Sequence, residues 1–125
     1  MKINLKNKKV IIIGGSGTIG KQITNDFSYC GAKVLVLDTT NKFLNKNQIS
    51  FKKLVIDSNT KLEIDLKKFL KIFGCPDIFI NCSYPKSKKW KSINFDKIDS
   101  SEISKNIEIH QNSYLLASTL IANLM

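Results

Sequence analysis

The sequence predicts an α/β fold built on a parallel sheet, and three observations support this. Short runs of β-branched and aliphatic residues recur along the chain, the clearest being 10–13 and 34–37. Stretches with apolar residues at helical spacing separate these runs. Each run is followed by Gly, Asp or Asn, residue types that favour turns and loops. Strands that alternate with helices are typical of parallel βαβ units.

The first half of the chain predicts one strand–helix–strand unit. The run 10–13 contains only Val and Ile, which indicates a strand buried on both faces. A helix is expected over about 17–30 and is ended by Gly31. The apolar stripe expected on this helix consists of Ile19, Ile23 and Phe27. The run 34–37 predicts the second strand, which closes on Asp38.

A polar connection follows the second strand. Residues 39–48 are rich in Asn and Lys and predict a loop, with one helical turn near Phe43 and Leu44. Residues 51–56 predict the third strand, which closes on Asp57.

The rest of the chain predicts a helix, a strand and a final helix. Gly74 and Pro76 end the first of these helices, and the fourth strand, 78–80, closes on Asn81. The apolar positions that define that helix are Leu62, Leu66, Phe69, Leu70 and Phe73.

The final helix follows a lysine-rich connection over 83–99. It is expected to begin near Ser100 or Ser101, to have Ser101 or Ser104 as its cap, and to reach the end of the chain.

The segment 14–20, with the sequence GGSGTIG, is the most specific signal for function. It follows a strand and opens a helix, and its glycines fit both G-x-G-x-x-G and G-x-x-G-x-x-G. Such glycines allow a tight turn and a close approach of the backbone to a pyrophosphate, which the helix N-terminus then binds. The absence of Gly-Lys-Ser/Thr excludes a P-loop NTPase, and a glycine-rich turn without a ligand is the alternative. The residues expected to bind a dinucleotide here are Gly14, Ser16, Gly17, Thr18, Ile19 and Gly20.

Asp38 stands where a ribose-binding acid is expected. It ends the second strand, 18 residues after Gly20. Its carboxylate could accept hydrogen bonds from the ribose hydroxyls of the cofactor and would repel a 2′-phosphate. No Lys or Arg occupies position 37, 39 or 40, so NAD is favoured over NADP. The alternative is an Asp that only begins a loop.

With these strand ends in place, the chain resembles the amino-terminal half of the short-chain dehydrogenase/reductase family. The resemblance covers essentially all 125 residues and implies one dinucleotide-binding domain, 1–125, truncated at its C-terminus relative to the family. It implies a Rossmann-like, doubly wound parallel sheet of about four strands in the order 3-2-1-4. The G-x-x-G-x-x-G spacing is similar to the extended branch of the family, and Ile13 and Thr18 depart from the shorter branch's pattern.

The resemblance also assigns roles to three residues outside the glycine-rich segment. Asp57 matches the acid that binds the adenine ring, although on its residues alone it could simply cap the next helix. Asn81 is the one match to the family's Asn-Asn-Ala-Gly segment after the fourth strand. His110 occupies the position of a catalytic Asn on the fourth helix.

The family's other catalytic elements, a Ser after the fifth strand and a Tyr-x-x-x-Lys on the fifth helix, have no counterpart here. The two Tyr-x-x-x-Lys spacings, which begin at Tyr29 and Tyr84, do not lie on one predicted helix. The expectation is an NAD-binding protein of oxidoreductase lineage, with hydride transfer to or from a carbonyl or hydroxyl substrate, that is inactive alone. The alternative is a non-catalytic dinucleotide-binding or regulatory module. Residues 100–125 are expected to contact a second copy or a complementing C-terminal half.

Composition narrows the remaining classes of function. The twenty basic residues are all lysines and the net charge is +10, which attracts polyanions without specificity but lacks the arginines of specific nucleic-acid readers. Three widely spaced cysteines and one histidine predict neither a disulfide scaffold nor a metal site. No apolar stretch suits a signal peptide or a membrane span, so a cytoplasmic location is expected.

Overall fold

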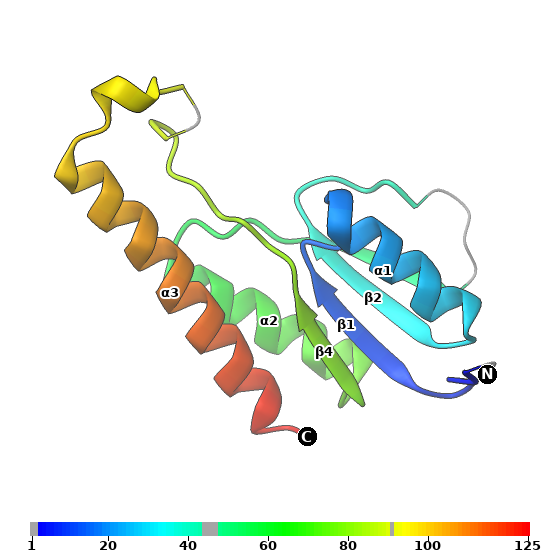
Figure 1. The fold of residues 1–125 in the computed structure, drawn as a ribbon. Coiled ribbons are helices and arrows are strands. Elements are labelled where there is room, and N and C mark those ends of the chain that lie inside the picture. The colour runs from blue at the N-terminus through cyan, green and yellow to red at the C-terminus, as the bar shows by residue number, and fades with distance from the viewer. Residues whose placement is uncertain (1–2, 44–47, 91) are drawn as a thin grey trace.

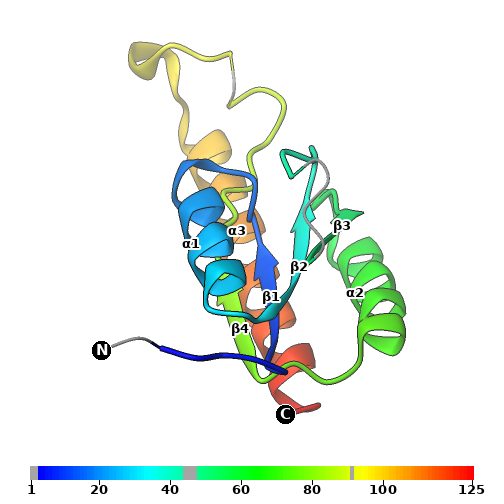
Figure 2. The same cartoon turned by 90° about the vertical axis from the view of Figure 1, so that its right-hand side faces the viewer.

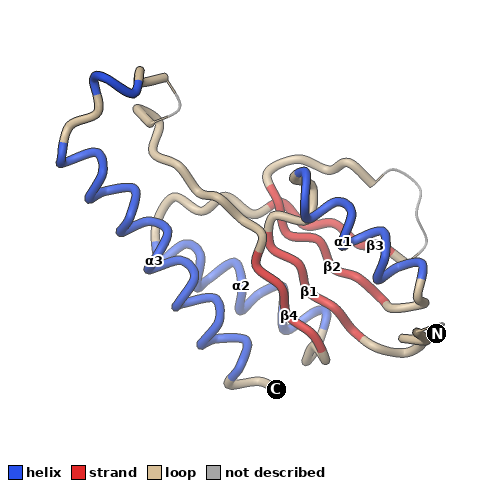
Figure 3. Tube along the Cα trace, in the orientation of Figure 1, coloured by secondary structure: helices blue, strands red, loops and turns tan. Residues whose placement is uncertain are grey.

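The computed structural model describes residues 3–43, 48–90 and 92–125, and over these residues it contains four strands and three α-helices (Figures 1 and 3). In chain order these elements are β1 (Lys9–Ile13), α1 (Thr18–Tyr29), β2 (Lys33–Asp38), β3 (Ile49–Lys53), α2 (Asn59–Phe73), β4 (Ile78–Asn81) and α3 (Ser100–Ala122). A short 3₁₀ helix, Phe95–Lys97, lies in the connection before α3.

The strands form one parallel sheet in the order β3-β2-β1-β4, which confirms the predicted order. β1 lies between β2 and β4, and its Val and Ile side chains are at most 1% exposed. Parallel strands buried on both faces require such unbroken apolar runs.

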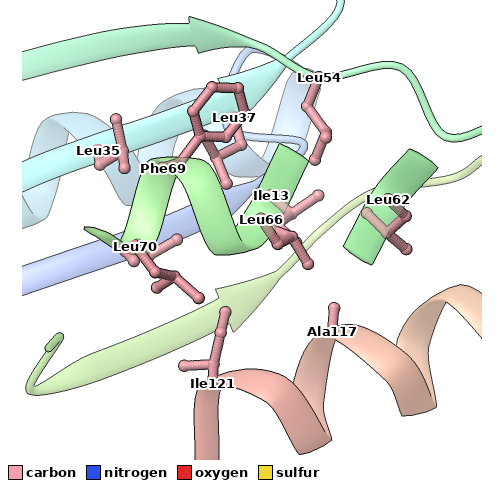
Figure 4. Packing of buried hydrophobic residues seen from close by; sticks show 11 residues of the cluster. Ile13, Leu35, Leu37, Leu54, Leu62, Leu66, Phe69, Leu70, Ala117 and Ile121 are labelled. Atoms are coloured by element: carbon pink, nitrogen blue, oxygen red, sulfur yellow. The ribbon is translucent and has the colours of Figure 1, made fainter. Parts of the chain in front are cut away.

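Helices cover both faces of the sheet (Figure 2). Alternate residues of a strand point to opposite faces, so Val10 and Ile12 pack on the α1 side, with Ile23 and Phe27. The other residues of the central strands pack against α2 and α3 (Figure 4). This second cluster includes Ile11, Ile13, Leu35, Leu37, Leu62, Leu66, Phe69, Leu70, Ala117 and Ile121. The result is the doubly wound, three-layer arrangement that the alternating pattern predicts.

The helix α3 is buried on only one face. Ala117 and Ile121 are at most 1% exposed, whereas Ile107 and Leu115 are about three-fifths exposed. Each fully buried aliphatic side chain contributes about 1.5–3 kcal/mol. The exposed face of α3 therefore forgoes stabilisation that a covering surface could provide.

The third strand is shorter and begins earlier than predicted. It spans Ile49–Lys53 rather than 51–56, and the Leu54 amide donates to the Asp38 carbonyl at 2.9 Å just after the strand ends. β3 is an edge strand whose one neighbour, β2, itself ends at Asp38. Beyond that point β3 has no backbone partner, so the apolar residues up to Ile56 continue outside the ladder.

Three further local predictions need correction or restriction. Ile19 is 71% exposed, because α1 turns Gly20 and Thr24 toward the protein. Asp99, not Ser101 or Ser104, caps α3, since its carboxylate accepts the Glu102 amide at 2.9 Å. Phe43 is buried in an irregular segment, and the helical turn expected there extends to a residue, 44, outside the described part of the chain.

No helix among the described residues is both long enough and apolar enough to cross a membrane.

Candidate functional site

The predicted nucleotide-binding residues other than Asp57 lie at the carboxyl ends of β1, β2 and β4. We call residues 14–20, which connect β1 to α1, the glycine loop. The Gly14 amide donates to the Leu37 carbonyl at 2.8 Å, and the Cys82 amide donates to the Ile13 carbonyl at 2.7 Å. These bonds hold the glycine loop between the end of β2 and the segment that follows β4. In open α/β sheets, ligands bind in the crevice at this end of the strands.

Two glycines of the loop are required by the fold itself. Gly14 has a φ of +76°, and a Cβ atom there would lie 2.6 Å from the Cys82 carbonyl carbon and the Ser83 nitrogen. A Cβ atom at Gly20 would collide with the Gly14 carbonyl oxygen. Glycine at these positions lets the loop pass close to β4 and to the first turn of α1.

Gly17 differs from these glycines. Its backbone is in an ordinary extended conformation, and a Cβ atom there would meet the Gly14 carbonyl oxygen at 3.4 Å, with no closer neighbour among the described residues. By contrast, a Cβ atom at Gly15 would lie 2.9 Å from Val36 Cγ1. The protein's own packing therefore does not explain why residue 17 lacks a side chain.

The N-terminus of α1 has no side-chain cap. Gly17 is the N-cap residue, the first turn contains no acid, and the Lys21 amide donates to the Gly17 carbonyl at 2.9 Å. The amides that precede Lys21 in a helix have no intrahelical acceptor. Together with the helix dipole, such amides form a binding position for an anion such as a phosphate group.

The carboxylate of Asp38 is bonded to the glycine loop. Its Oδ2 accepts the Ser16 amide at 2.8 Å, while its Oδ1 accepts the amide and hydroxyl of Thr39 at 2.6 and 3.3 Å. A carboxylate has about four acceptor positions, so one remains on Oδ2. The structure thus brings Asp38 and the glycine loop together as the sequence predicts.

Asn81 lies beside the loop with a fixed side-chain orientation. Its Oδ1 accepts both the amide and the hydroxyl of Ser83, at 3.0 and 2.7 Å. Because Oδ1 takes these bonds, Nδ2 points elsewhere. The Asn81 Nδ2 and the Ser16 Oγ are the two buried side-chain polar atoms without a hydrogen-bond partner in the described part of the chain. Unsatisfied buried polar atoms are uncommon and call for an explanation.

Asp57 lies at the start of α2 and, among the described residues, forms no hydrogen bond or ion pair with Asp38, Asn81 or the glycine loop. It is exposed and forms an ion pair with Lys61 at 2.9 Å, and the hydrogen bond from Lys61 lowers the pKa of its carboxyl group. Ser58, rather than Asp57, caps α2 by accepting the Lys61 amide at 3.3 Å. The predicted role of Asp57 in adenine binding remains a prediction.

His110 contacts two tyrosines near the end of β4. The centroid of its ring lies 4.4 Å from that of Tyr84 and 5.8 Å from that of Tyr114. The Tyr114 hydroxyl donates to the Ser83 carbonyl, which ties α3 to the segment that abuts Gly14. Tyr114 is not among the site residues predicted from the sequence, although its spacing of four residues from His110 places the two on one helix face.

Cys82 follows Asn81 and is half-buried against the apolar cluster on the α1 side. Burial raises the pKa of its thiol, which disfavours the nucleophilic thiolate. Within the described ranges, no group of three or more His, Cys, Asp or Glu residues could hold a metal ion.

Comparison with solved structures gives many matches to this arrangement. A short-chain dehydrogenase from Leptospira borgpetersenii with bound NAD⁺ superposes with a TM-score of 0.77, at 22% identity over 97% of this chain and 47% of that chain. An aldohexose dehydrogenase from Thermoplasma acidophilum, in ligand-free form, gives 0.75 and 20% over 97% and 45%. A putative D-mannonate oxidoreductase from Haemophilus influenza, with bound NAD, gives 0.74 and 20% over 97% and 51%.

The chain has the fold of the amino-terminal half of a short-chain dehydrogenase/reductase. It spans about half the length of the solved structures that it matches. No protein-family model matches the sequence, and no curated protein matches it significantly.

Within this short-chain dehydrogenase fold, neither Tyr-x-x-x-Lys spacing lies on one helix. Tyr29 is the last residue of α1, and Lys33 is the first residue of β2. Tyr84 and Lys88 lie in the connection between β4 and α3, outside any helix. A general acid and its lysine need to face the same point, as residues four apart on one helix do, so neither pair can act together in that way.

Proposed function

We propose that this chain binds NAD at the carboxyl end of its sheet and belongs to the short-chain dehydrogenase/reductase lineage. The proposed binding residues are those of the glycine loop together with Asp38, Asp57 and Asn81. The observation that carries the proposal is the pair of buried, unpartnered polar atoms, Ser16 Oγ and Asn81 Nδ2, beside the uncapped start of α1. Structural neighbours with bound NAD support the same ligand class.

The residues present fit a dinucleotide. A pyrophosphate could accept hydrogen bonds from the free amides at the start of α1 and from the Ser16 hydroxyl. Because residue 17 has no side chain, the pyrophosphate could come close to the backbone of the glycine loop. Asp38 Oδ2 has one acceptor position left for a ribose hydroxyl. The bond from Thr39 Oγ1 to Oδ1 is the longest of the three bonds to the carboxylate, at 3.3 Å, and its loss would free an acceptor position for a second ribose hydroxyl.

The nicotinamide of the cofactor supplies hydride transfer when it is bound. The chain's own contribution would be to bind and orient. Asn81 Nδ2 is a donor whose direction is fixed by the two bonds from Ser83, so it could hold a polar group at the end of β4. Tyr114 would steady that segment through its bond to the Ser83 carbonyl. His110, between Tyr84 and Tyr114, is placed beside the same segment.

Titration with NADH, followed by its fluorescence, tests the binding. Gly17→Val should abolish binding, since a branched side chain would occupy the proposed position of the pyrophosphate, whereas its Cβ atom would meet only the Gly14 carbonyl oxygen, at 3.4 Å. Lys21→Val is the matched control, because it adds the same β-branched residue one turn later on the exposed side of α1. Unchanged affinity in Gly17→Val, or equal losses in both variants, would contradict the proposal.

We also propose that NAD is preferred over NADP. Asp38→Ala removes a charge that repels a 2′-phosphate and an acceptor for the ribose, and NAD affinity should fall about tenfold or more, since a charge-assisted hydrogen bond contributes about 1.5–3 kcal/mol. Asp38→Asn keeps an acceptor for the Ser16 amide but removes the charge, so it separates cofactor choice from loop structure. An unchanged ratio of the two affinities in both variants would exclude Asp38 from ribose recognition.

The chemistry we propose for the lineage is hydride transfer to or from a carbonyl or hydroxyl group. Residues 1–125 would form one dinucleotide-binding domain that lacks the family's Ser and helical Tyr-x-x-x-Lys, so we expect no turnover by this chain alone. Loss of a positioned acid–base group costs about 10²–10⁴-fold in rate. NADH oxidation by the purified chain with a panel of carbonyl compounds would contradict this. NADH binding without turnover would equally suit a non-catalytic or regulatory module, the second candidate.

The proposed partner surface combines β4 and the outer face of α3. β4 is an edge strand with apolar residues, and α3 exposes Ile107 and Leu115. We propose that a second copy or a complementing C-terminal half covers this surface. Light scattering after size-exclusion chromatography should show self-association of the isolated chain. A stable monomer of 14.1 kDa would exclude a second copy as the cover of this surface and leave the complementing half as the proposed partner.

A further inference from the structure

The register of the β2–β3 ladder places a lysine opposite the ribose-binding acid. Asp38 is paired with Lys53, and the preceding pairs are Leu37 with Lys52 and Val36 with Phe51. Neighbouring strands lie about 4.8 Å apart. Lys53 is therefore a spatial neighbour of Asp38, although fifteen positions separate the two in the sequence.

Lys53 and Asp38 share one face of the sheet. Val36 and Phe51 pack in the apolar cluster on the α1 side, and side chains two positions further along a strand return to the same face. Asp38 and Lys53 thus project on the side of the sheet that carries α1 and the start of the glycine loop. Lys52, paired with Leu37, projects on the opposite face, toward α2.

The ammonium group of Lys53 is available for a ligand. The side chain is exposed, and it has no hydrogen-bond or ion-pair partner among residues 3–43, 48–90 and 92–125. The Asp38 carboxylate instead accepts the bonds from Ser16 and Thr39. A lysine side chain is long and flexible enough to reach a group bound beside a neighbouring strand.

We propose that Lys53 is a second cofactor-selecting residue, which supplies a positive charge at the 2′ position of the adenosine ribose. This inference rests on the proposed dinucleotide binding and deepens it. Asp38 repels a 2′-phosphate, and Lys53 offsets that repulsion, so the site accepts NADPH as well as NADH with a limited preference. A charge partner in this exposed setting changes affinity several-fold rather than by orders of magnitude.

The test compares NADH and NADPH affinities of the whole chain by fluorescence titration. Lys53→Gln should weaken NADPH binding about three- to tenfold and leave NADH binding within twofold. Lys52→Gln is the matched control: it removes the same charge one residue away, on the other face of the sheet, and should leave the ratio of affinities unchanged. Lys53→Arg should keep the parental ratio. Since Lys53 is exposed, we expect all three variants to fold, which circular dichroism verifies.

The outcomes separate this inference from the proposed function. If the parent binds NADH and Lys53→Gln leaves the ratio of affinities unchanged, the inference is wrong and the proposed function stands. Equal changes in Lys52→Gln and Lys53→Gln would mean that overall charge, not position, sets NADPH affinity, and would also overturn it. If the parent binds neither nucleotide, the proposed function fails and the inference fails with it.

Discussion

The N-termini of α1 and α2 lie on connections that leave the same end of the sheet, yet they are built in opposite ways. At α2, Ser58 caps the helix by accepting the Lys61 amide, and the carboxylate of Asp57 pairs with the Lys61 ammonium at 2.9 Å. At α1, the N-cap residue is Gly17, which offers no side chain to accept a backbone amide. A side chain of the protein thus accepts a free backbone amide at the start of α2, whereas no side chain does so at the start of α1.

The residue type at the N-cap therefore distinguishes a helix start that serves the fold from one that is free to bind a ligand. Ser and Asp at the start of a helix satisfy its free amides internally. Glycines leave those amides exposed, and in this chain they sit beside the unpartnered Ser16 hydroxyl. Compared with a Ser or Asp cap, Gly17 at the N-cap costs α1 only roughly 0.3 kcal/mol, which a bound anion would offset.

The largest effect is expected from Gly14→Ala. The positive φ of Gly14 and its contact with the Ser83 nitrogen should make this variant unstable by about 3 kcal/mol or more. Gly17→Ala should cost less than about 1 kcal/mol, because the open helix end has room for the methyl group. Urea unfolding of both variants measures this. Equal losses would mean that Gly17, too, is needed only for the fold.

Ser16→Ala should separate binding from stability. Removal of an unpartnered buried hydroxyl does not weaken the fold, and can strengthen it slightly. The same change removes a donor to the proposed pyrophosphate, so NADH affinity should fall about tenfold. Ser50→Ala, at an exposed position of β3, is the control and should change neither quantity. A less stable Ser16→Ala variant with normal NADH affinity would show that the hydroxyl serves the fold instead.

Ser58→Ala, at the capped N-terminus of α2, should change stability and leave NADH binding intact. Loss of this cap should lower the free energy of unfolding by about 1 kcal/mol and leave NADH affinity unchanged. Ser58→Asp, which keeps a capping acceptor, should restore the stability. Weakened NADH binding in Ser58→Ala, with its stability intact, would break the distinction between the two helix ends.

Acid should loosen α2 through Asp57. The hydrogen bond from Lys61 lowers the pKa of this carboxyl group in the folded state. Its stabilising contribution is therefore complete above the unfolded pKa, about 3.9, and is lost as the pH falls below 4 through the folded pKa. Asp57→Asn should reduce the slope of stability against pH in that window, as measured by thermal unfolding. An identical slope in parent and variant would contradict the role of the ion pair.

The sheet order and the position of β1 followed from the sequence, since buried parallel strands such as β1 must be continuously apolar. The length of β3 did not, because its last paired residue is set by where its neighbour β2 ends. The same limitation hid Lys53, which the sequence places near Asp57 and the register places beside Asp38.

Candidate site residues were predictable where the backbone itself makes the site. The glycine loop and Asp38 meet as expected, because the loop follows one strand and the acid ends the next. The orientation of Asn81 was not predictable, since it depends on Ser83 and on the contact between Tyr114 and Ser83. The role predicted for Asp57 from the family pattern remains a prediction, and in the structure its carboxylate pairs with the local Lys61.

Titration of the ¹⁵N-labelled chain with NAD⁺, followed by amide chemical shifts, tests whether the N-terminus of α1 binds the dinucleotide. We expect the largest changes on the amides of residues 15–20 and on Ser83, and only small changes on the amides of the first turn of α2. Saturable changes centred on α2, or no change at the glycine loop at millimolar NAD⁺, would show that the open end of α1 is not a dinucleotide-binding site.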